Sequence, residues 1–335
     1  MCPRRWTRTT IARPGCRSDR PAQVRSVSRV LRQLVTIPLL ALGVALVAYV
    51  LIDALPGDPA RVVAGAGADA GNVEAVREQL GLDKPAAQRL LEYLGGLFRG
   101  DLGTSFQTGR PVLTELLAVF PTTVQLAVVA EVVALTAGLL IGALAALRGG
   151  RFASNALMTG SAVAVSLPMF ALALLLQLVF AQWLGWLPPS GSGGILSAAI
   201  VLPAVTCAIP SAGFVARFAR ASIAGHLDDE HVRTAVAKGV RPATVGRRHV
   251  LRVSYGPLIS VAAADLSRLL GGVAIVEVIF SWPGAGKYAY DALVHRDLPA
   301  LQGALLAITI VVLLTNQFAE IAYRLVDPRI GAHDD

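Results

Sequence analysis

The uncharged stretch LPMFALALLLQLVFAQWLGWLPPS, residues 167–190, lies within a longer run that carries no formal charge between Arg151 and Arg217. This run is far longer than the roughly 20 residues that one helix needs to cross about 30 Å of hydrocarbon. Trp183, Trp186 and the prolines after them divide the run, and tryptophan is common at membrane interfaces. The run therefore predicts two membrane-spanning helices, at residues 154–182 and 195–216.

The composition of the whole chain agrees with a membrane protein. Hydrophobic residues make up 54% of the 335 residues and charged residues 16%, with a mean hydropathy of +0.60. These values lie outside the usual range of soluble domains. Four further apolar runs reach the length of a span, so we expect an all-α polytopic membrane bundle of about six transmembrane helices. The four further spans are expected at residues 33–52, 121–147, 255–280 and 298–319.

The distribution of positive charge predicts which side each loop occupies. Lys and Arg accumulate on the cytoplasmic side of spans, and six spans place both termini on one side. The segments assigned to the inside hold 21 of the 30 Lys and Arg, including nine arginines in residues 1–33, and those assigned to the outside hold 8. We therefore expect cytoplasmic N and C termini in a bacterial cell membrane.

This topology divides the chain into a disordered basic tail, a transmembrane domain and a short C-terminal tail. The tail lacks the apolar core of a signal peptide. Within the transmembrane domain we expect a large external lobe and a cytoplasmic loop. The expected boundaries are 1–29 for the tail, 30–330 for the transmembrane domain, 53–117 for the lobe, 217–254 for the loop and 331–335 for the C-terminal tail.

Residues 228–239, DDEHVRTAVAKG, form a short polar segment within that cytoplasmic loop. Acidic residues at its start, Asp228 or Asp229, are suited to cap free N–H groups of a helix, and Gly239 is suited to end one. A helix below roughly 12 residues is marginal alone in water, so it needs a docking surface. The predicted docking stripe, at i, i+3, i+4 and i+7, consists of Val232, Ala235, Val236 and Gly239.

The pattern Arg233-Thr234-Ala235-x-Ala-Lys238-Gly239, followed by His249-Val250-Leu251-Arg252, resembles the EAA loop of bacterial ABC importer permeases of the dipeptide/oligopeptide/nickel family. It departs from the general motif in having Arg233 where Glu is usual and Arg252 near the usual Leu-Pro. The resemblance implies that the segment is a coupling helix seated in a groove of a cytoplasmic ATPase. The implied coupling residues are Asp229, Glu230, Val232, Arg233, Thr234, Ala235, Val236, Lys238 and Gly239.

Other short motifs resemble landmarks of the same family in the same order along the chain. Leu55-Pro56-Gly57-Asp58-Pro59 follows the first span, although by spacing alone it is equally a Pro/Gly helix stop. A predicted helix at residues 72–80, ending at Gly81, precedes the next motif. The landmark residues are Gly57, Asp58, Pro59, Gly100, Asp101, Gly103, Pro283, Gly284, Gly286, Asp327 and Pro328.

The resemblance implies a permease subunit of an ATP-driven, binding-protein-dependent importer for peptides, with nickel or another small solute as the alternative. It also implies several partners: a second homologous permease, two ATPase domains, an external solute-binding protein and the surrounding lipid. No phosphate-binding loop of the form G-x-x-x-x-G-K-[S/T] occurs. The nearest approach has Ser281 in place of Gly and Tyr288 in place of Ser or Thr. We therefore expect no enzymatic activity and no bound cofactor in this chain, with ATP and Mg²⁺ used by the partner ATPase.

Metal and nucleic-acid sites are not expected. His226 and His231 are five residues apart and no H-E-x-x-H motif occurs, so no zinc helix is predicted. Arg247 and Arg248 lack interleaved aromatic residues, which favours a membrane-surface or protein-partner face over a nucleic-acid patch.

Four ionisable residues fall within or near predicted spans, where such groups are costly and usually face the bundle interior or a water path. Asp265 and Arg268 are three residues apart on one helical face and are suited to pair, either as a self-neutralised contact or as part of a transport route. Glu277 matches an acidic position of the resembled family, although its place near the outer end of a span also allows contact with interfacial water. The translocation-path candidates are Glu277, Asp265, Arg268 and Glu131.

Two other function classes remain open. A polytopic membrane enzyme would need paired catalytic groups at membrane depth, and no histidine falls within a predicted span. A passive channel differs from an importer only in lacking the coupling element, so dependence of transport on ATP separates the two.

Overall fold

The computed structural model describes residues 38–50, 58–65, 67–147, 150–194, 197–227, 229–246 and 251–326. The two predicted tails and the residues Gly57, Asp228, Asp327 and Pro328 lie outside these ranges. The described residues form the helix Pro38–Val50, α2 (Pro59–Ala64), α3 (Ala70–Gln79), α4 (Ala86–Phe98), α5 (Val112–Leu147), α6 (Arg151–Ser166), α7 (Met169–Leu176), the π-helix Gln177–Trp183, the 3₁₀ turn Ala198–Ile200, α8 (Val201–Gly225), α9 (Glu230–Ala237), α10 (Pro242–Val245), α11 (Leu251–Ile279), α12 (Ala285–Val294) and α13 (Leu298–Val326).

The predicted all-α bundle is confirmed. Within the described ranges the backbone forms helices, and β-pairing is limited to one isolated bridge between Thr104 and Pro111. Three helices, those at residues 112–147, 198–225 and 298–319, are long and apolar enough to cross a membrane. At 29 residues α11 extends over about 43 Å, which is also long enough, but it carries three charged side chains in its second half.

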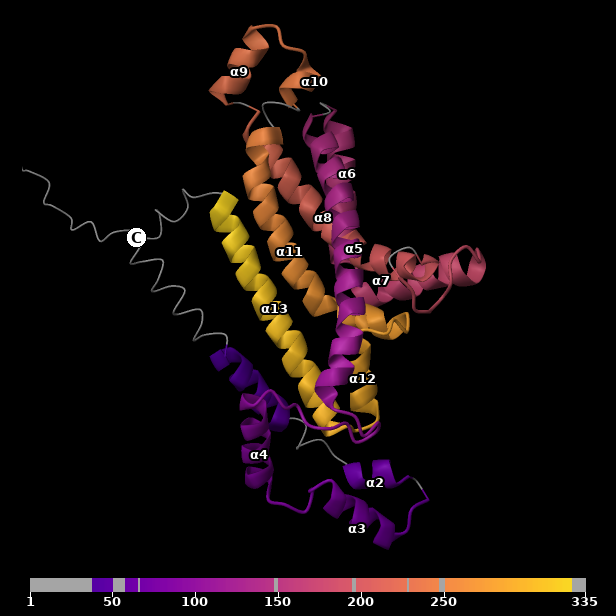
Figure 1. Cartoon of the computed structure of the whole chain (residues 1–335). Coiled ribbons are helices and arrows are strands. Elements are labelled where there is room, and N and C mark those ends of the chain that lie inside the picture. The colour runs from indigo at the N-terminus through magenta and orange to yellow at the C-terminus, as the bar shows by residue number, and fades with distance from the viewer. Residues whose placement is uncertain are drawn as a thin grey trace, which may run out of the picture.

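The predicted single span at residues 154–182 is wrong as a straight helix, because α6 and the α7 segment meet at 101°. Proline disfavours the helical conformation of the residue before it and has no N–H to continue the hydrogen-bond ladder. Leu167 accordingly has extended backbone angles, φ −72° and ψ 128°, and Pro168 is the N-cap of α7, which begins at Met169. The helices Arg151–Ser166 and Met169–Trp183 form either one broken span or a re-entrant segment. In Figure 1, α7 points sideways out of the bundle.

The other span boundaries differ at their ends. α5 begins at Val112, nine residues before the predicted start, so it includes residues that we assigned to the lobe, and Pro121 lies inside it. Apolar residues continue through this region, which explains why the helix continues too. α8 and α13 also extend past their predicted last residues, by nine and seven positions.

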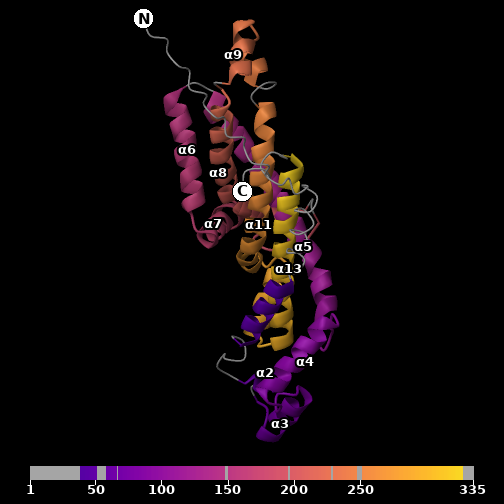
Figure 2. The ribbon, with the colours of Figure 1, turned by 90° about the vertical axis from the view of Figure 1, so that its left-hand side faces the viewer.

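Helix α8 is the centre of the bundle and packs on α5, α6, α7 and α11. Figure 2 shows α6, α8 and α11 standing side by side. Gly138 and Gly142 of α5, spaced as in the small-residue motifs of membrane helix pairs, let the two backbones approach. A Cβ at Gly142 would lie 2.6 Å from Ala216 O, and one at Gly213 of α8 would lie 2.6 Å from Ser161 O in α6. Small residues therefore set the distance between α8 and both neighbours.

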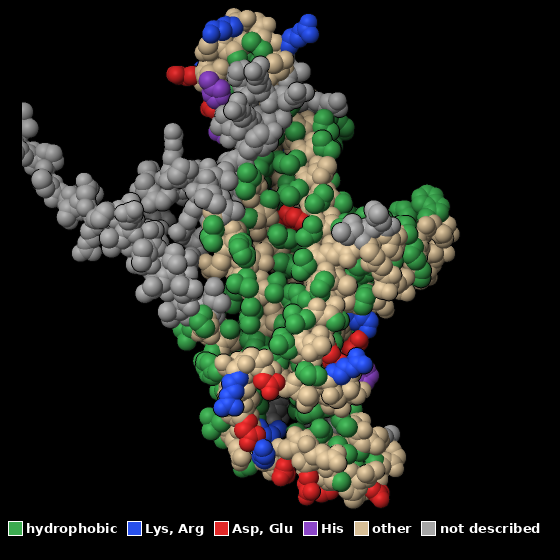
Figure 3. All heavy atoms as spheres, viewed as in Figure 1, with side chains coloured by type: hydrophobic (Ala, Val, Ile, Leu, Met, Phe, Trp, Pro, Cys, Tyr) green, Lys and Arg blue, Asp and Glu red, His purple; other side chains and the backbone are tan. Residues whose placement is uncertain are grey.

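Polar structure gathers at the two ends of the bundle. The segment containing α2, α3 and α4, which we call the α2–α4 lobe, lies at one end, and α9 and α10 lie at the opposite end (Figure 1). In the space-filling view, hydrophobic side chains cover the middle of the bundle, and most Lys, Arg, Asp and Glu side chains on that face lie toward its ends (Figure 3). This arrangement suits a protein whose middle lies in lipid.

Candidate functional site

Helix α9 docks on its own bundle through part of the predicted stripe. Val232 and Ala235 are only 3% and 6% exposed and pack with Ile223 and Val245. Val236, predicted to share this face, is 60% exposed. The prediction that all four stripe residues dock together on another protein is therefore wrong, because an eight-residue helix first needs a surface within its own chain.

The end of α9 is closed by its glycine. Gly239 has φ +75°, in the left-handed region that glycine adopts without strain. Its N–H donates to Val236 O at 2.9 Å, and the N–H of Val240 donates to Ala235 O at 3.2 Å. These two bonds form a Schellman motif, which satisfies the last carbonyl groups of the helix. The predicted end of the helix at Gly239 is confirmed.

The start of α9 is built differently from the prediction. Asp229 occupies the N-cap position, but its side chain caps no backbone N–H. Its carboxylate instead lies 2.9 Å from His226 Nδ1 and 3.9 Å from His231 Nδ1. The backbone oxygen of Asp229 accepts the first helical bonds, from Val232 N and Arg233 N.

The outward face of α9 is mixed in character. Its exposed members carry both signs of charge and one large apolar side chain, Val236. Thr234 Oγ donates to Glu230 O within the helix at 2.8 Å. The predicted coupling residues that are exposed on this face are Glu230, Arg233, Thr234, Val236, Lys238 and Gly239.

The predicted pairing of Asp265 with Arg268 is present in α11. Arg268 Nε donates to Asp265 Oδ1 at 3.0 Å, and its NH2 donates to Ser211 Oγ of α8 at 2.9 Å. The guanidinium also lies over the Phe214 ring, 5.5 Å from its centroid. Arg268 thereby joins α11 to α8, while 47% of its side chain stays exposed.

Glu131 of α5 completes this group of charged residues. Both of its carboxyl oxygens, and Asp265 Oδ2, are buried and receive no N–H or O–H donor from the other described side chains, so the two acidic groups interact with each other inside the bundle. Three of the four path candidates are buried inside the bundle, on α5 and α11, which pack together: Glu131, Asp265 and Glu277. The fourth, Arg268, reaches the surface of the bundle. Their role in a transport route stays a prediction.

Glu277 lies apart from that group and is tied to the backbone. It is 0% exposed, which excludes contact with interfacial water. Its Oε2 accepts from Gly286 N at 2.7 Å and from Lys287 N at 3.2 Å, in the first turn of α12. A carboxylate at a helix N-terminus satisfies free N–H groups and complements the helix dipole. Glu277 therefore connects α11 to α12, and its contact with a transported solute stays a prediction.

The landmark segment 281–286 forms the turn between these two helices and fastens it to α5. Trp282 is fully buried, and its Nε1 donates to Thr122 O at 3.1 Å. Ala285 N donates to Thr123 Oγ at 2.8 Å, and Thr122 Oγ donates to Pro283 O.

Two landmark positions of the turn, 284 and 286, leave no room for a side chain and therefore require glycine. A Cβ at Gly284 would lie 2.0 Å from Glu277 Oε1, and one at Gly286 would lie 2.4 Å from Ala274 Cα. Sequence analysis missed α12 and this fastening. The available indication was an acidic residue followed by glycines seven and nine positions later, with an amphipathic segment after them.

Glu277→Ala is expected to destabilise the α11–α12 connection. It leaves the buried N–H of Gly286 unpaired, at a cost of about 1–3 kcal/mol, and the partly buried N–H of Lys287 as well, whereas Glu277→Gln keeps a carbonyl acceptor. The measurement is the thermal unfolding midpoint of the purified protein, which should fall clearly for Ala and less for Gln. Glu78→Ala, at an exposed position of α3, is the control. Equal midpoints for Glu277→Ala and Glu78→Ala would show that Glu277 does not hold the turn.

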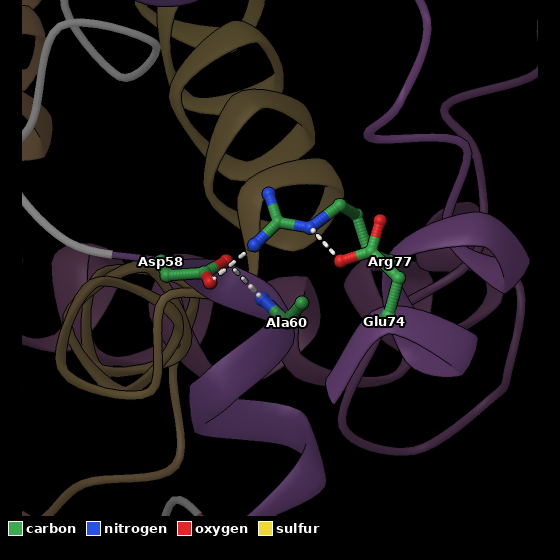
Figure 4. Close-up of polar contacts among 4 residues, drawn as sticks. All are labelled: Asp58, Ala60, Glu74 and Arg77. Carbon is green, nitrogen blue, oxygen red and sulfur yellow. Dashed lines mark hydrogen bonds and ion pairs between the residues drawn. The ribbon is translucent and has the colours of Figure 1, made fainter. Parts of the chain in front are cut away.

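In the α2–α4 lobe, the landmark Asp58 organises two helices (Figure 4). Asp58 Oδ1 accepts from Ala60 N at 3.1 Å and so caps α2, in which Pro59 is the first residue. Its Oδ2 accepts from Arg77 NH2 at 2.7 Å, and Arg77 Nε donates to Glu74 Oε2 at 3.1 Å. Asp58 therefore ties α2 to α3.

The landmarks around residue 100 shape the loop before α5. Gly100 and Gly103 have φ values of +77° and +81°, and Asp101 Oδ1 accepts from Gly103 N at 2.8 Å. Gly103 O in turn accepts from Val112 N at the start of α5. Within the described residues, no group of three or more His, Cys, Asp or Glu is placed to hold a metal ion.

Comparison with known families gives two matches. Residues 138–332 match the family described as binding-protein-dependent transport system inner membrane component. Residues 27–127 match the N-terminal part described for the membrane components of such systems.

Curated relatives resemble the chain over most of its length. A probable peptide ABC transporter permease of Sinorhizobium fredii is 36% identical over 308 residues, 90% of this chain and 98% of the relative. The glutathione transport system permease of Escherichia coli K12 is 36% identical, over 86% of this chain and 93% of the relative. The di/tripeptide transport system permease of Pseudomonas aeruginosa is also 36% identical, over 86% and 94%.

Among solved structures, an inward-facing methionine ABC transporter matches 64% of this chain and 96% of its own chain, with a TM-score of 0.55 and 19% identity. An amino acid ABC transporter matches with a TM-score of 0.52. At this level of identity the likeness concerns the fold.

Proposed function

Because this chain belongs to the family of binding-protein-dependent transport system inner membrane components, we propose that it is the permease subunit of an ATP-driven importer of peptides. The observation that carries the peptide assignment is the likeness, over 86–90% of the chain, to permeases named for peptides, glutathione and di- and tripeptides. The chain is a multi-pass protein of the cytoplasmic membrane.

Energy comes from partner subunits in this proposal. The outward face of α9 fits into a groove of a separate ATPase, while Val232 and Ala235 transmit its movement to α8 through their packing with Ile223. ATP and Mg²⁺ belong to that partner, and this chain binds neither. Closure of two ATPases would move two such helices together and reorient the spans as rigid bodies.

The translocation route lies between this permease and a second, homologous one. Large apolar side chains remain exposed along the bundle, and Arg268 reaches its surface. A charged group within a span faces protein or water rather than lipid. The face that carries Arg268 is therefore the one assigned to the route, with cargo delivered by an external solute-binding protein.

The test is uptake by the complete importer in proteoliposomes. Trialanine should accumulate only when ATP and the solute-binding protein are both present. Accumulation of Ni²⁺ but not of trialanine would replace peptide by nickel as the cargo, and uptake without ATP would indicate a channel.

We expect the α2–α4 lobe to lie outside the cell and α9 inside. This orientation is supported by the concentration of Lys and Arg in the segments assigned to the inside. Ala87 of α4 and Lys238 after α9 are both exposed and lie at opposite ends of the bundle. Ala87→Cys should react with an impermeant thiol reagent on intact cells, and Lys238→Cys only after permeabilisation, in a background without Cys2 and Cys16. Labelling of both variants on intact cells would contradict this topology.

A further inference from the structure

A cavity of about 500 Å³ lies between the loop 105–110, the first turns of α5, and α12. Small-molecule sites typically have volumes of about 300–1,000 Å³. Its charged and aromatic lining comes from Arg110, Glu115, Tyr288, Asp291, His295 and Asp297. Under the proposed topology it opens on the outer side, where cargo arrives.

One wall of this cavity is held rigidly by a buried carboxylate. Asp297, 2% exposed, accepts from Ser105 Oγ and from the backbone N–H groups of Phe106 and Gln107. It also accepts from Ala300 N, in the first turn of α13. The loop is thereby fixed to the end of α13, so the cavity is formed before any ligand enters.

The acidic side of the cavity carries two carboxylates, Glu115 and Asp291, each of which has one oxygen available to accept a hydrogen bond. Glu115 Oε2 accepts from Tyr288 OH at 2.8 Å. Burial and the neighbouring Glu115 raise the pKa of Tyr288, so its hydroxyl remains a donor. Asp291 Oδ2 pairs with Lys287 of the same helix. Among the described residues, the second oxygen of each carboxylate has no hydrogen-bond partner, which leaves an acceptor on each side chain.

The loop carries the opposite charge. Arg110 is exposed at the edge of the cavity, and within the described part of the chain its guanidinium forms no ion pair with Glu115 or Asp291. The cavity therefore presents a free cation on the loop and acceptors on α5 and α12. A ligand with a carboxylate at one end and an ammonium group at the other would match both.

We propose that this cavity binds the two charged termini of a short peptide, the carboxylate on Arg110 and the ammonium group on Glu115 and Asp291. The inference rests on the proposed peptide cargo. It assigns this chain a binding site of its own, outside the spans, that cargo occupies before it enters the route. The apolar lining of the cavity includes Ala118, Val119, Ala292 and Ala300, whose small side chains leave room for peptide side chains of varied size.

The test measures protection of a cysteine placed in the cavity. Thr114→Cys, at an exposed position in the lining, is introduced without Cys2 and Cys16, while the buried Cys207 is kept. The importer in lipid nanodiscs, without solute-binding protein, is labelled with a charged thiol reagent at rising concentrations of trialanine. Trialanine should slow labelling, and N-acetyl-trialanine amide, which lacks both terminal charges, should not.

Charge removal should weaken this protection. Arg110→Gln or Glu115→Gln should raise the trialanine concentration for half-protection about tenfold, as expected for losing one charge-assisted contact. The glutamine at 115 retains an acceptor for Tyr288, so the wall stays intact. Arg99 is exposed at the end of α4 and lies outside the cavity, so Arg99→Gln should leave the trialanine concentration for half-protection unchanged. A cysteine introduced by Ala87→Cys, also outside the cavity, should not be protected by trialanine.

Three outcomes would overturn the proposal: no protection by trialanine, equal protection by the blocked peptide, or unchanged protection in both charge variants. Protection that appears only on adding cargo-free solute-binding protein would identify the cavity as a protein-docking surface instead. ATP-driven trialanine uptake is measured on the same preparation with the binding protein added. Uptake without protection refutes this site alone, whereas absence of uptake refutes the peptide function.

Discussion

Gly142→Ala is expected to remove most of the folded protein from the membrane. A Cβ at this position of α5 would lie 2.6 Å from both Ala216 O and Ala219 Cβ and 3.0 Å from Arg220 N. Two of these three neighbours are backbone atoms of α8, which cannot rotate away as a side chain could. Gly138, one turn earlier, meets Val215 and Ala212 O at similar distances, so α5 cannot simply tilt to relieve the clash.

The expected cost of Gly142→Ala is about 3 kcal/mol or more, at the upper end of the range for overpacking. A typical domain has a total stability of roughly 5–15 kcal/mol, so this is a large fraction. Abundance in membranes and the thermal unfolding midpoint in detergent should both fall. Gly160→Ala on α6 makes the same chemical change where no atom lies within 4 Å, and should be neutral or mildly stabilising. Similar behaviour of the two variants would contradict the close α5–α8 packing.

Val236→Asp is expected to abolish transport while leaving the permease folded. Val236 is the large apolar side chain on the outward face of α9, and it contributes nothing to the buried contact with Ile223. If that face enters an ATPase groove, the new carboxylate becomes buried there without a counter-charge. Such a charge costs about 3 kcal/mol or more, which corresponds to a loss of affinity of roughly a hundredfold.

The measurement for Val236→Asp combines co-purification of the ATPase with uptake and stimulated ATP hydrolysis. Val62→Asp makes the same change at an exposed valine of α2, at the opposite end of the bundle, and should leave all three unaffected. Gly239→Val tests the same element through the backbone, because φ +75° is strained by about 1–2 kcal/mol for a residue with a side chain and no atom is near enough to clash. Wild-type co-purification and uptake in both variants would show that α9 is not the coupling element.

Several site features were predictable because they depend on neighbours in the chain. The end of α9 at Gly239 and the pairing of Asp265 with Arg268 involve residues within one or two helical turns, where spacing decides the geometry. The predicted helix at 72–80 likewise corresponds to α3, which is followed by Gly81 at φ +64°. The 101° bend at Leu167–Pro168 was available from the same local rule about proline, but the continuous apolar run favoured a single span.

By itself, the sequence determined that this is a membrane protein. It also determined where the main spans lie and which segment forms α9. Those properties follow from the length of apolar runs and from local backbone preferences, because lipid accepts only segments that satisfy their own hydrogen bonds. The tertiary structure decided which residues, distant in the sequence, contact one another. An apolar stripe shows that one face of α9 is buried but not against what, and only the fold brings Ile223 and Val245 to it. Glu277 meets Gly286 in a turn clamped by Thr123, 162 positions from Ala285, and no pattern along the chain encodes a contact at that separation.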